Sequence, residues 1–206
     1  SDPIISQYLL ELTPPTLQDN AADMERLQRA LANGPGVRNL DVDLSVARGL
    51  DQTLREGNWR VTAVVERQLH SNSSRLVAVR PGDAVGSSLG AAVDIGTTTV
   101  TVAIADLKSG RIIDTAASFN RQISCGEDVI SRIVYSQRGD GLRHLQRLVR
   151  ETINDLIDDL CTRHKLEPRC IDHMVVAGNT IMTHLFLGLA PKYIRQEPYV
   201  PTASRF

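Results

Sequence analysis

The chain has 206 residues, of which 42% are hydrophobic, and its 23 lysines and arginines nearly balance its 24 aspartates and glutamates. This length suggests one large domain or two small ones, and the balanced charge gives no electrostatic case for nucleic acid or an anionic membrane as the main partner. No apolar stretch approaches the length of a membrane span and no leader-like segment opens the sequence, so we expect a cytoplasmic protein.

The first part of the chain predicts an arm followed by a small α+β domain. A Pro-Pro pair argues against a helix within residues 1–18, which we expect to form an extended arm or linker. The expected elements of the domain at 19–86 are a helix from Asp19 or Asn20 to about 32, a short strand at 37–42, a helix at 44–56, and strands at 59–66 and 75–82 joined by a turn at 70–74. These elements carry no catalytic constellation.

The region from residue 91 to residue 206 begins with strands and continues mainly with helices. Its expected elements are strands at 91–95, 98–105 and 111–119, helices at 127–137 and 142–164, a strand at 173–178, a helix at 180–187, and an extended tail after 191. The helix at 142–164 repeats its apolar side chains with a strong period of about 3.6 residues. Strands and helices in both regions predict an α/β fold class.

An acid, a glycine and three threonines stand at the turn between the first two strands of this region. Gly96 permits a sharp turn and lets a ligand approach the backbone closely. Thr97, Thr98 and Thr99 offer the hydroxyl and N–H donors that a polyphosphate needs, and Asp94 can hold the water ligands of Mg²⁺. The turn therefore predicts a clamp for a Mg²⁺–nucleotide, although a plain threonine-rich hairpin would carry the same residues. The chain contains no P-loop and no G-x-G-x-x-G motif that opens a helix after a strand.

Two further polar groups follow strands of the same predicted sheet. Asn120 and Gln122 come after the third strand. Either they line the cleft in which the nucleotide would bind or contact a partner, or they form a polar turn that hydrogen-bonds its own backbone. Gly178, Asn179 and Thr180 end the fourth strand and open a helix, whose N-terminus adds N–H donors. Asn179 or Thr180 also suits an ordinary N-cap, so we expect a capped helix whose start faces the cleft.

Three other residues carry no predicted role. Asp128 and Arg132 are four apart on a predicted helix, and we expect a surface ion pair without a functional role. His184 either reaches the cleft or packs inside, and it is left out of the catalytic set.

Longer strings of sequence resemble known families. DIGTTTVTVAI at 94–104 resembles the first phosphate motif of the actin-like ATPase superfamily, and the order of elements over 91–187 is similar to the first ribonuclease-H-like half of that fold. FNRQISCGEDVISRI at 119–133 and HMVVAGNTIMTHLFLGLAP at 173–191 resemble the reductive activators of corrinoid proteins, as does LELTPPTLQDNAADMERL at 10–27.

This resemblance implies an ATP-driven protein that returns inactivated cobalt(II) corrinoid to cobalt(I) with electrons from a [2Fe-2S] domain. It implies a corrinoid protein of a methyltransferase system as partner, a ferredoxin-like domain in cis, a possible homodimer, and ATP and Mg²⁺ as cofactors. Asp94 is then the catalytic residue, which holds Mg²⁺ through water. The implied ATP contacts are Gly96, Thr97, Thr98, Thr99, Asn120, Gln122, Gly178, Asn179 and Thr180.

The resemblance also predicts how the chain divides. We expect a linker or arm at 1–18, a middle domain at 19–86, and the incomplete first part of an actin-like ATPase domain at 91–206. The cysteines, three in number and widely spaced, do not provide a four-cysteine cluster ligand set, so we expect a fragment that lacks the iron–sulfur domain and the second ATPase half. Arg121 stands where the family pattern leads us to expect proline, which predicts a less rigid turn.

Two alternatives remain open at this point. The first is a small-molecule kinase of the same superfamily, which would need a substrate pocket and a catalytic base that we do not identify in the sequence. The second is a non-enzymatic docking module for a corrinoid protein or a ferredoxin-like domain. A cysteine-rich ferredoxin-like segment encoded upstream would favour the activator over the kinase.

Overall fold

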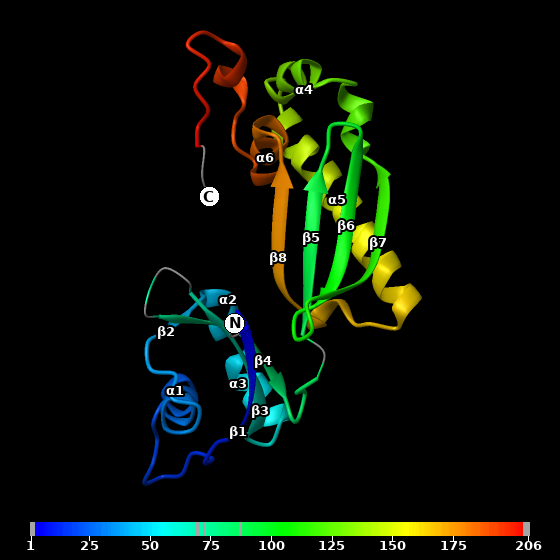
Figure 1. The fold of residues 1–206 in the computed structure, drawn as a ribbon. Coiled ribbons are helices and arrows are strands. Elements are labelled where there is room, and N and C mark those ends of the chain that lie inside the picture. Colours follow the sequence, from blue (N-terminus) through cyan, green and yellow to red (C-terminus); the bar gives the residue numbers. More distant parts are fainter. Residues whose placement is uncertain (1–2, 69–70, 72, 87, 204–206) are drawn as a thin grey trace. The chain divides into compact units, whose positions relative to one another are not determined.

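The computed structural model describes residues 3–68, 71, 73–86 and 88–203 (Figure 1). The chain divides into two compact units, Ser1–Ser88 and Leu89–Phe206. Each unit combines a four-stranded sheet with helices, which confirms the predicted α/β class. The predicted turn at 70–74 falls partly outside the described residues.

The sheet of the first unit has the strand order β1-β3-β4-β2. Its strands are β1 (Ile5–Glu11), β2 (Leu40–Val42), β3 (Arg60–Arg67) and β4 (Ser74–Pro81). β3 pairs antiparallel with both β1 and β4, and β2 pairs in parallel with β4. Residues 5–11 were expected to belong to an arm, but they form an edge strand because Ile5 and Leu10 bury their side chains there.

The helices of the first unit are α1 (Asp23–Asn33), α2 (Leu44–Ala47) and α3 (Leu50–Glu56). Leu27 and Leu31 of α1 and Leu54 of α3 are fully buried in the core that these helices share with the sheet. The prediction of a single helix at 44–56 is wrong. Gly49 interrupts it and serves as the N-cap of α3, in keeping with the low helix propensity of glycine.

The predicted N-cap of the first helix is also wrong. Helix α1 begins after Ala22, which makes no side-chain cap. Asp19 instead accepts a hydrogen bond of 2.7 Å from Nη1 of Arg26, which is almost fully buried. A charge-assisted bond to a buried arginine is stronger than a neutral cap, so Asp19 is used to hold the preceding loop against the helix.

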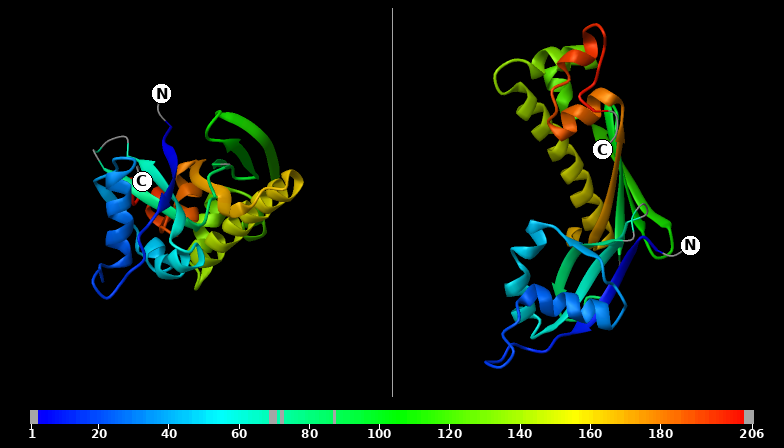
Figure 2. Two further views of the ribbon diagram at one scale, coloured as in Figure 1. Left: turned by 90° about the horizontal axis from the view of Figure 1, so that it is seen from below. Right: turned by 90° about the vertical axis from the view of Figure 1, so that its left-hand side faces the viewer.

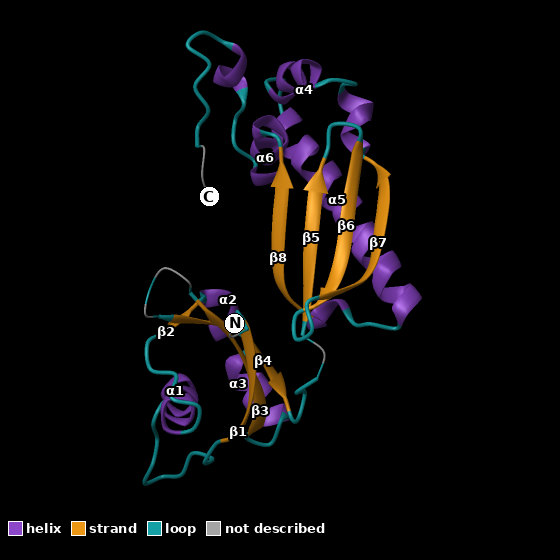
Figure 3. Ribbon diagram, in the orientation of Figure 1, coloured by secondary structure: helices purple, strands orange, loops and turns teal. Residues whose placement is uncertain are grey.

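The second unit is built on a sheet with the strand order β7-β6-β5-β8 (Figure 3). Its strands are β5 (Leu89–Ile95), β6 (Thr99–Asp106), β7 (Arg111–Phe119) and β8 (Ile171–Gly178). β5, β6 and β7 form an antiparallel meander, and β8 pairs in parallel with β5 after a helical crossover. The expected succession of three strands, helix, strand and helix is therefore present.

The helical elements of this unit are η1 (Arg121–Cys125), α4 (Val129–Ser136), α5 (Gly141–His164), η2 (Pro168–Cys170), α6 (Thr180–Leu187) and η3 (Lys192–Arg195). Figure 2 shows α5 along one face of the sheet. Leu145, Val149 and Leu160 of α5 are buried against the side chains of Val93 and Val102 from the sheet. The tail after 191 contains a short 3₁₀ turn where we expected an extended chain.

The opposite face of this sheet is exposed along β5, where Ala92 and Asp94 point outward. Asp94 is exposed there, and its register partners are Thr101 on β6 and Ala177 on β8. Strand side chains alternate between faces, so Asp94 points away from α5 while its neighbours Val93 and Ile95 point toward it. Among the helices in the described part of the chain, none is both long and apolar enough to cross a membrane.

Candidate functional site

The turn between β5 and β6 is closed by Gly96. Its N–H donates to the carbonyl oxygen of Thr99 at 2.9 Å. A Cβ atom at position 96 would lie 2.5 Å from that same oxygen, closer than a real Cβ can approach. We expected this glycine to make room for a ligand, but the structure gives an intrachain reason: any side chain here would force the hairpin open.

The carbonyl oxygens of residues 96–98 in the turn all accept hydrogen bonds from Asn120 or Arg132, which lie on the inner side of the turn. The oxygen of Gly96 accepts from Nδ2 of Asn120 at 2.9 Å, and the oxygen of Thr97 accepts from Nη2 of Arg132 at 2.7 Å. The oxygen of Thr98 accepts from the backbone N–H of Asn120 at 2.8 Å. Three consecutive peptide carbonyls are thus fixed by two residues from elsewhere in the unit.

Fixing the carbonyls also orients the N–H groups. The peptide bonds of the turn are trans, and in a planar trans peptide the N–H points opposite to the C=O. The N–H groups of Thr97 and Thr98 therefore point away from Asn120 and Arg132, toward the outside of the turn. Within the described residues neither N–H donates to a protein acceptor, and Thr98 is exposed. The turn presents two adjacent N–H donors, an arrangement that suits an anion.

Asn120 and Gln122 belong to the support behind the turn. Both are fully buried, so they are not placed to contact a ligand in this structure. The side-chain oxygen of Asn120 accepts from the N–H of Gln122 at 3.0 Å. Nε2 of Gln122 donates to the carbonyl oxygen of Leu145 on α5 at 2.9 Å. The alternative in which these residues bond the backbone of their own turn is the one that the structure favours.

Arg132 is the residue that the sequence interpretation missed. The expected surface ion pair with Asp128 is wrong, because Arg132 is fully buried and no ion pair joins the two among the described residues. Asp128 instead caps α4, accepting from the N–H of Ser131 at 2.8 Å, and this bond holds the pKa of its carboxyl below the ordinary value. One signal was available: Val129, Arg132 and Ile133 have the spacing of an apolar helix stripe.

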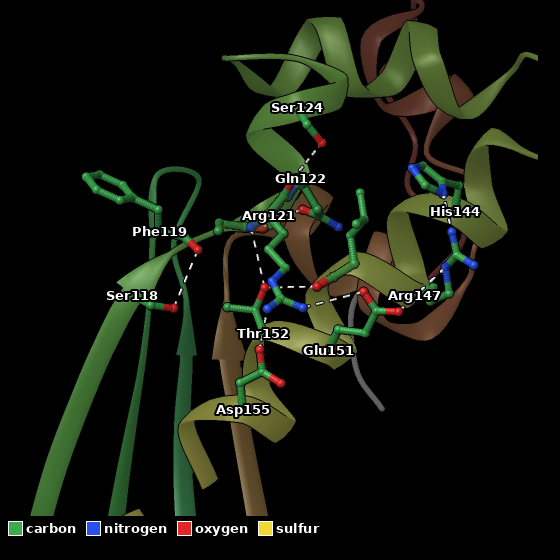
Figure 4. Close-up of polar contacts among 12 residues, drawn as sticks. Ser118, Phe119, Arg121, Gln122, Ser124, His144, Arg147, Glu151, Thr152 and Asp155 are labelled. Carbon is green, nitrogen blue, oxygen red and sulfur yellow. Dashed lines mark hydrogen bonds and ion pairs between the residues drawn. The ribbon is translucent and has the colours of Figure 1, made fainter. Parts of the chain in front are cut away.

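Arg121 anchors the segment that carries Asn120 and Gln122. Its guanidinium forms ion pairs with Glu151, at 3.6 Å, and with Asp155, both on α5 (Figure 4). Its backbone N–H donates to Oγ1 of Thr152 at 3.4 Å. The turn was expected to be less rigid without a proline, but these contacts join it to the longest helix of the unit.

Gly178, Asn179 and Thr180 lie at the same edge of the sheet as the turn. β8 runs parallel to β5, and Gly178 is the register partner of Ile95. Asn179 caps α6, accepting from the N–H of Met182 at 2.9 Å, as predicted for this position. All three residues are exposed.

His184 and Met182 fill the interior side of α6. His184 is fully buried, and its Nδ1 lies 2.6 Å from the carbonyl oxygen of Thr180, so it packs within its own helix. The sulfur of Met182 lies 3.4 Å from Nη1 of Arg132. Arg132 therefore contacts both strand-end motifs, the β5–β6 turn and the start of α6.

Asp94 stands beside the turn as an exposed carboxylate. Its side chain forms no hydrogen bond or ion pair with any other described residue. No group of three or more potential metal ligands occurs in the described part of the chain. A single exposed carboxylate beside a turn with two outward N–H donors has the chemistry to hold waters of Mg²⁺ when the turn binds a phosphate.

The chain matches known proteins over nearly its whole length. Residues 1–86 match the family model described as the RACo linker region, and residues 89–206 match the model described as the RACo middle region. The expected middle domain at 19–86 thus lies in the match called linker region. The expected ATPase part at 91–206 lies in the match called middle region.

Two relatives extend this match. The corrinoid activation enzyme RamQ of Eubacterium limosum is 29% identical over 203 residues, which cover 97% of this chain and 32% of the relative. A solved structure titled reductive activator for corrinoid, iron–sulfur protein is 42% identical, with a TM-score of 0.76, over 98% of this chain and 32% of that chain. This chain spans about one third of the length of either protein. With both of its units matched by the family models, the chain belongs to the RACo family.

Proposed function

We propose that this chain is part of an ATP-dependent reductive activator, which returns an inactive cobalt(II) corrinoid protein to cobalt(I). The names of its two relatives support a role in corrinoid activation. The observation that carries the nucleotide part of the proposal is the β5–β6 turn, whose N–H groups at Thr97 and Thr98 point outward beside Asp94. The electrons would come from a [2Fe-2S] domain outside this chain, and the partner would be the corrinoid protein of a methyltransferase system.

The residues of the turn divide the work of holding the nucleotide. The N–H and hydroxyl groups of Thr97 and Thr98 bind the terminal phosphates, and the hydroxyl of Thr99 extends this set of donors. Asp94 holds waters of Mg²⁺, and the ion, when bound, neutralises charge on the phosphates. Phosphoryl chemistry depends mainly on positioning and charge stabilisation, so the turn needs no covalent intermediate.

The other predicted residues take two different roles. Asn179 and Thr180 are exposed at the same edge of the sheet, and the N-terminus of α6 adds N–H donors there. Asn120 and Gln122 are buried, and they hold the turn in shape instead of contacting the nucleotide. Nucleotide binding can drive an unfavourable electron transfer only if the nucleotide prefers the competent conformation or its hydrolysis is coupled to the step.

Substitution of Asp94 in the full-length protein tests this proposal. We expect Asp94→Ala to abolish ATP-dependent formation of cobalt(I), measured by the absorption spectrum of the corrinoid, because Mg²⁺ loses its carboxylate. Asp159→Ala is a matched control, since Asp159 is an exposed carboxylate of the same unit whose partner is Arg163 at 2.9 Å. Cobalt reduction at the wild-type rate in Asp94→Ala would remove the role given to this residue.

A further inference from the structure

Arg132 is a buried cation whose partners are neutral. Its Nε donates to the carbonyl oxygen of Gly126 at 2.9 Å, and Nη2 donates to that of Thr97 at 2.7 Å. Its Nη1 contacts Oε1 of Gln122 at 3.2 Å and the sulfur of Met182. No carboxylate forms an ion pair with it among the described residues. These contacts give each of its three nitrogens a neutral acceptor, and the Asp128 carboxylate acts on the charge only from beyond ion-pair distance.

An unpaired buried charge is costly, so its position calls for a reason. Burial lowers the pKa of the Arg132 guanidinium, but an arginine stays protonated in proteins. Removing a charge from water costs free energy unless an opposite charge compensates it. A neutral side chain such as glutamine could bond one or two of these groups but would bring no positive charge, so the charge itself needs an explanation.

The position of the guanidinium relative to the Thr97–Thr98 peptide supplies that reason. Arg132 binds the C=O of the peptide between Thr97 and Thr98, and the N–H of the same peptide points outward. A cation bound to the oxygen of a peptide polarises the group and makes its N–H a stronger donor. An anion in front of the turn therefore lies in line with the guanidinium behind it, with one peptide between them.

We propose that Arg132 is a positioning residue that makes the β5–β6 turn selective for phosphate charge. It sets the outward direction of the Thr98 N–H and supplies the positive charge behind it. The inference rests on the proposed nucleotide binding and adds its source of charge selectivity. Arg132 does not touch the ligand, and its effect on the phosphates passes through the Thr97–Thr98 peptide.

The test compares ligands that differ in phosphate charge, bound to full-length protein carrying Arg132→Gln. Isothermal titration calorimetry measures the Kd of Mg-ATP directly and the Kd of adenosine by competition. We expect the Mg-ATP Kd to rise about tenfold or more, as for loss of a charge-assisted interaction, with adenosine binding unchanged. Arg132→Lys keeps the charge but not the fork of donors, and it should retain part of the preference for Mg-ATP.

Two comparisons keep the outcomes distinct. Arg26→Gln removes the other arginine that is buried among the described residues, in the first unit, and should leave both Kd values unchanged. Equal weakening of Mg-ATP and adenosine binding in the Arg132 variants would mean a purely structural role, and unchanged Mg-ATP binding would exclude any role. Either result would overturn the inference about Arg132 without affecting the proposed function. If the wild-type protein binds no Mg-ATP, the proposed function fails with it. Should Arg132→Gln not fold, the ratio of the two Kd values is measured in Arg132→Lys, where we expect a smaller rise of the Mg-ATP Kd and unchanged adenosine binding.

Discussion

Gly96 has no room for a side chain, because a Cβ atom there would lie 2.5 Å from the carbonyl oxygen of Thr99. We predict that Gly96→Ala destabilises the second unit by about 1–3 kcal/mol, the usual range for overpacking a closed site. Chemical denaturation measures this change. Gly86→Ala is the control, since a Cβ at position 86 meets no atom within 4 Å. Equal stability of the two variants would contradict the closed hairpin.

At the level of single residues the sequence predicted the exposed residues of the candidate site better than the buried residues that support the turn. Asp94 and Thr98 are exposed at a turn, as their local pattern indicated. The burial of Asn120 and Arg132 was not predicted, because it depends on which surfaces of η1 and α4 face the turn. Local sequence contains only weak information about such packing. The four-residue spacing of Asp128 and Arg132 favoured a surface pair that tertiary contacts override.

A contact between elements joins β7 to the C-terminal end of α5. The carboxylate of Asp114 accepts from Nη1 of Arg163 at 2.7 Å and lies 2.8 Å from Nε2 of His164. The hydrogen bond from His164, followed by that from the N–H of Thr115, lowers the pKa of the Asp114 carboxyl below its ordinary value of 3.8. A lowered folded-state pKa adds stability above the unfolded value and loses it as the pH falls through the folded value.

We therefore predict that the free energy of unfolding depends less on pH in Asp114→Asn than in the wild type at acid pH. The free energy of unfolding of wild type and variant should differ most above the ordinary carboxyl pKa of 3.8, and the difference should shrink as the pH drops below it. Urea denaturation across this range measures both curves. A constant difference at every pH would show that the Asp114 carboxylate adds no proton-linked stability.

Elements with strong end signals were predicted well. Helix α6 has the predicted bounds, 180–187, because Asn179 caps its start and Gly188, at φ 72°, ends it in the left-handed region. Strand β1 was missed because its pattern ISQYLLE alternates weakly and two prolines follow it closely. Its place in the sheet depends on pairing with β3, which lies about fifty residues further along the chain.

At the scale of the whole molecule the two cores share no residue. One core contains residues between 10 and 76, and the other contains residues between 89 and 185. We predict that the two units unfold in separate transitions, seen by calorimetry. Leu31→Ala should lower the midpoint temperature of the first unit's transition only, and Leu145→Ala that of the second unit's transition only. Each substitution should reduce the free energy of unfolding of its own unit by about 2–5 kcal/mol. A single transition that moves in both variants would show that the units unfold together.

The fold class followed from the sequence because hydrophobic period and turn residues agree along most of the chain. The α/β class and the succession of elements after residue 91 depend on repeats such as that of α5, which a single sequence displays fully. The pairing of β2 with β4, and the join of η1 to α5, depend on contacts between distant segments. Those contacts are fixed only when the chain is compact.

The β5–β6 turn depends on side chains outside it, so the short string D-x-G-T-T does not by itself identify or reproduce this turn in another protein. The groups that orient its amides come from Asn120 and Arg132, which lie more than twenty residues downstream. A loop graft carrying residues 94–99 alone into a foreign hairpin would bring the threonines without the side chains that turn their amides outward. Searches and designs based on this string should therefore require the downstream asparagine and arginine as well.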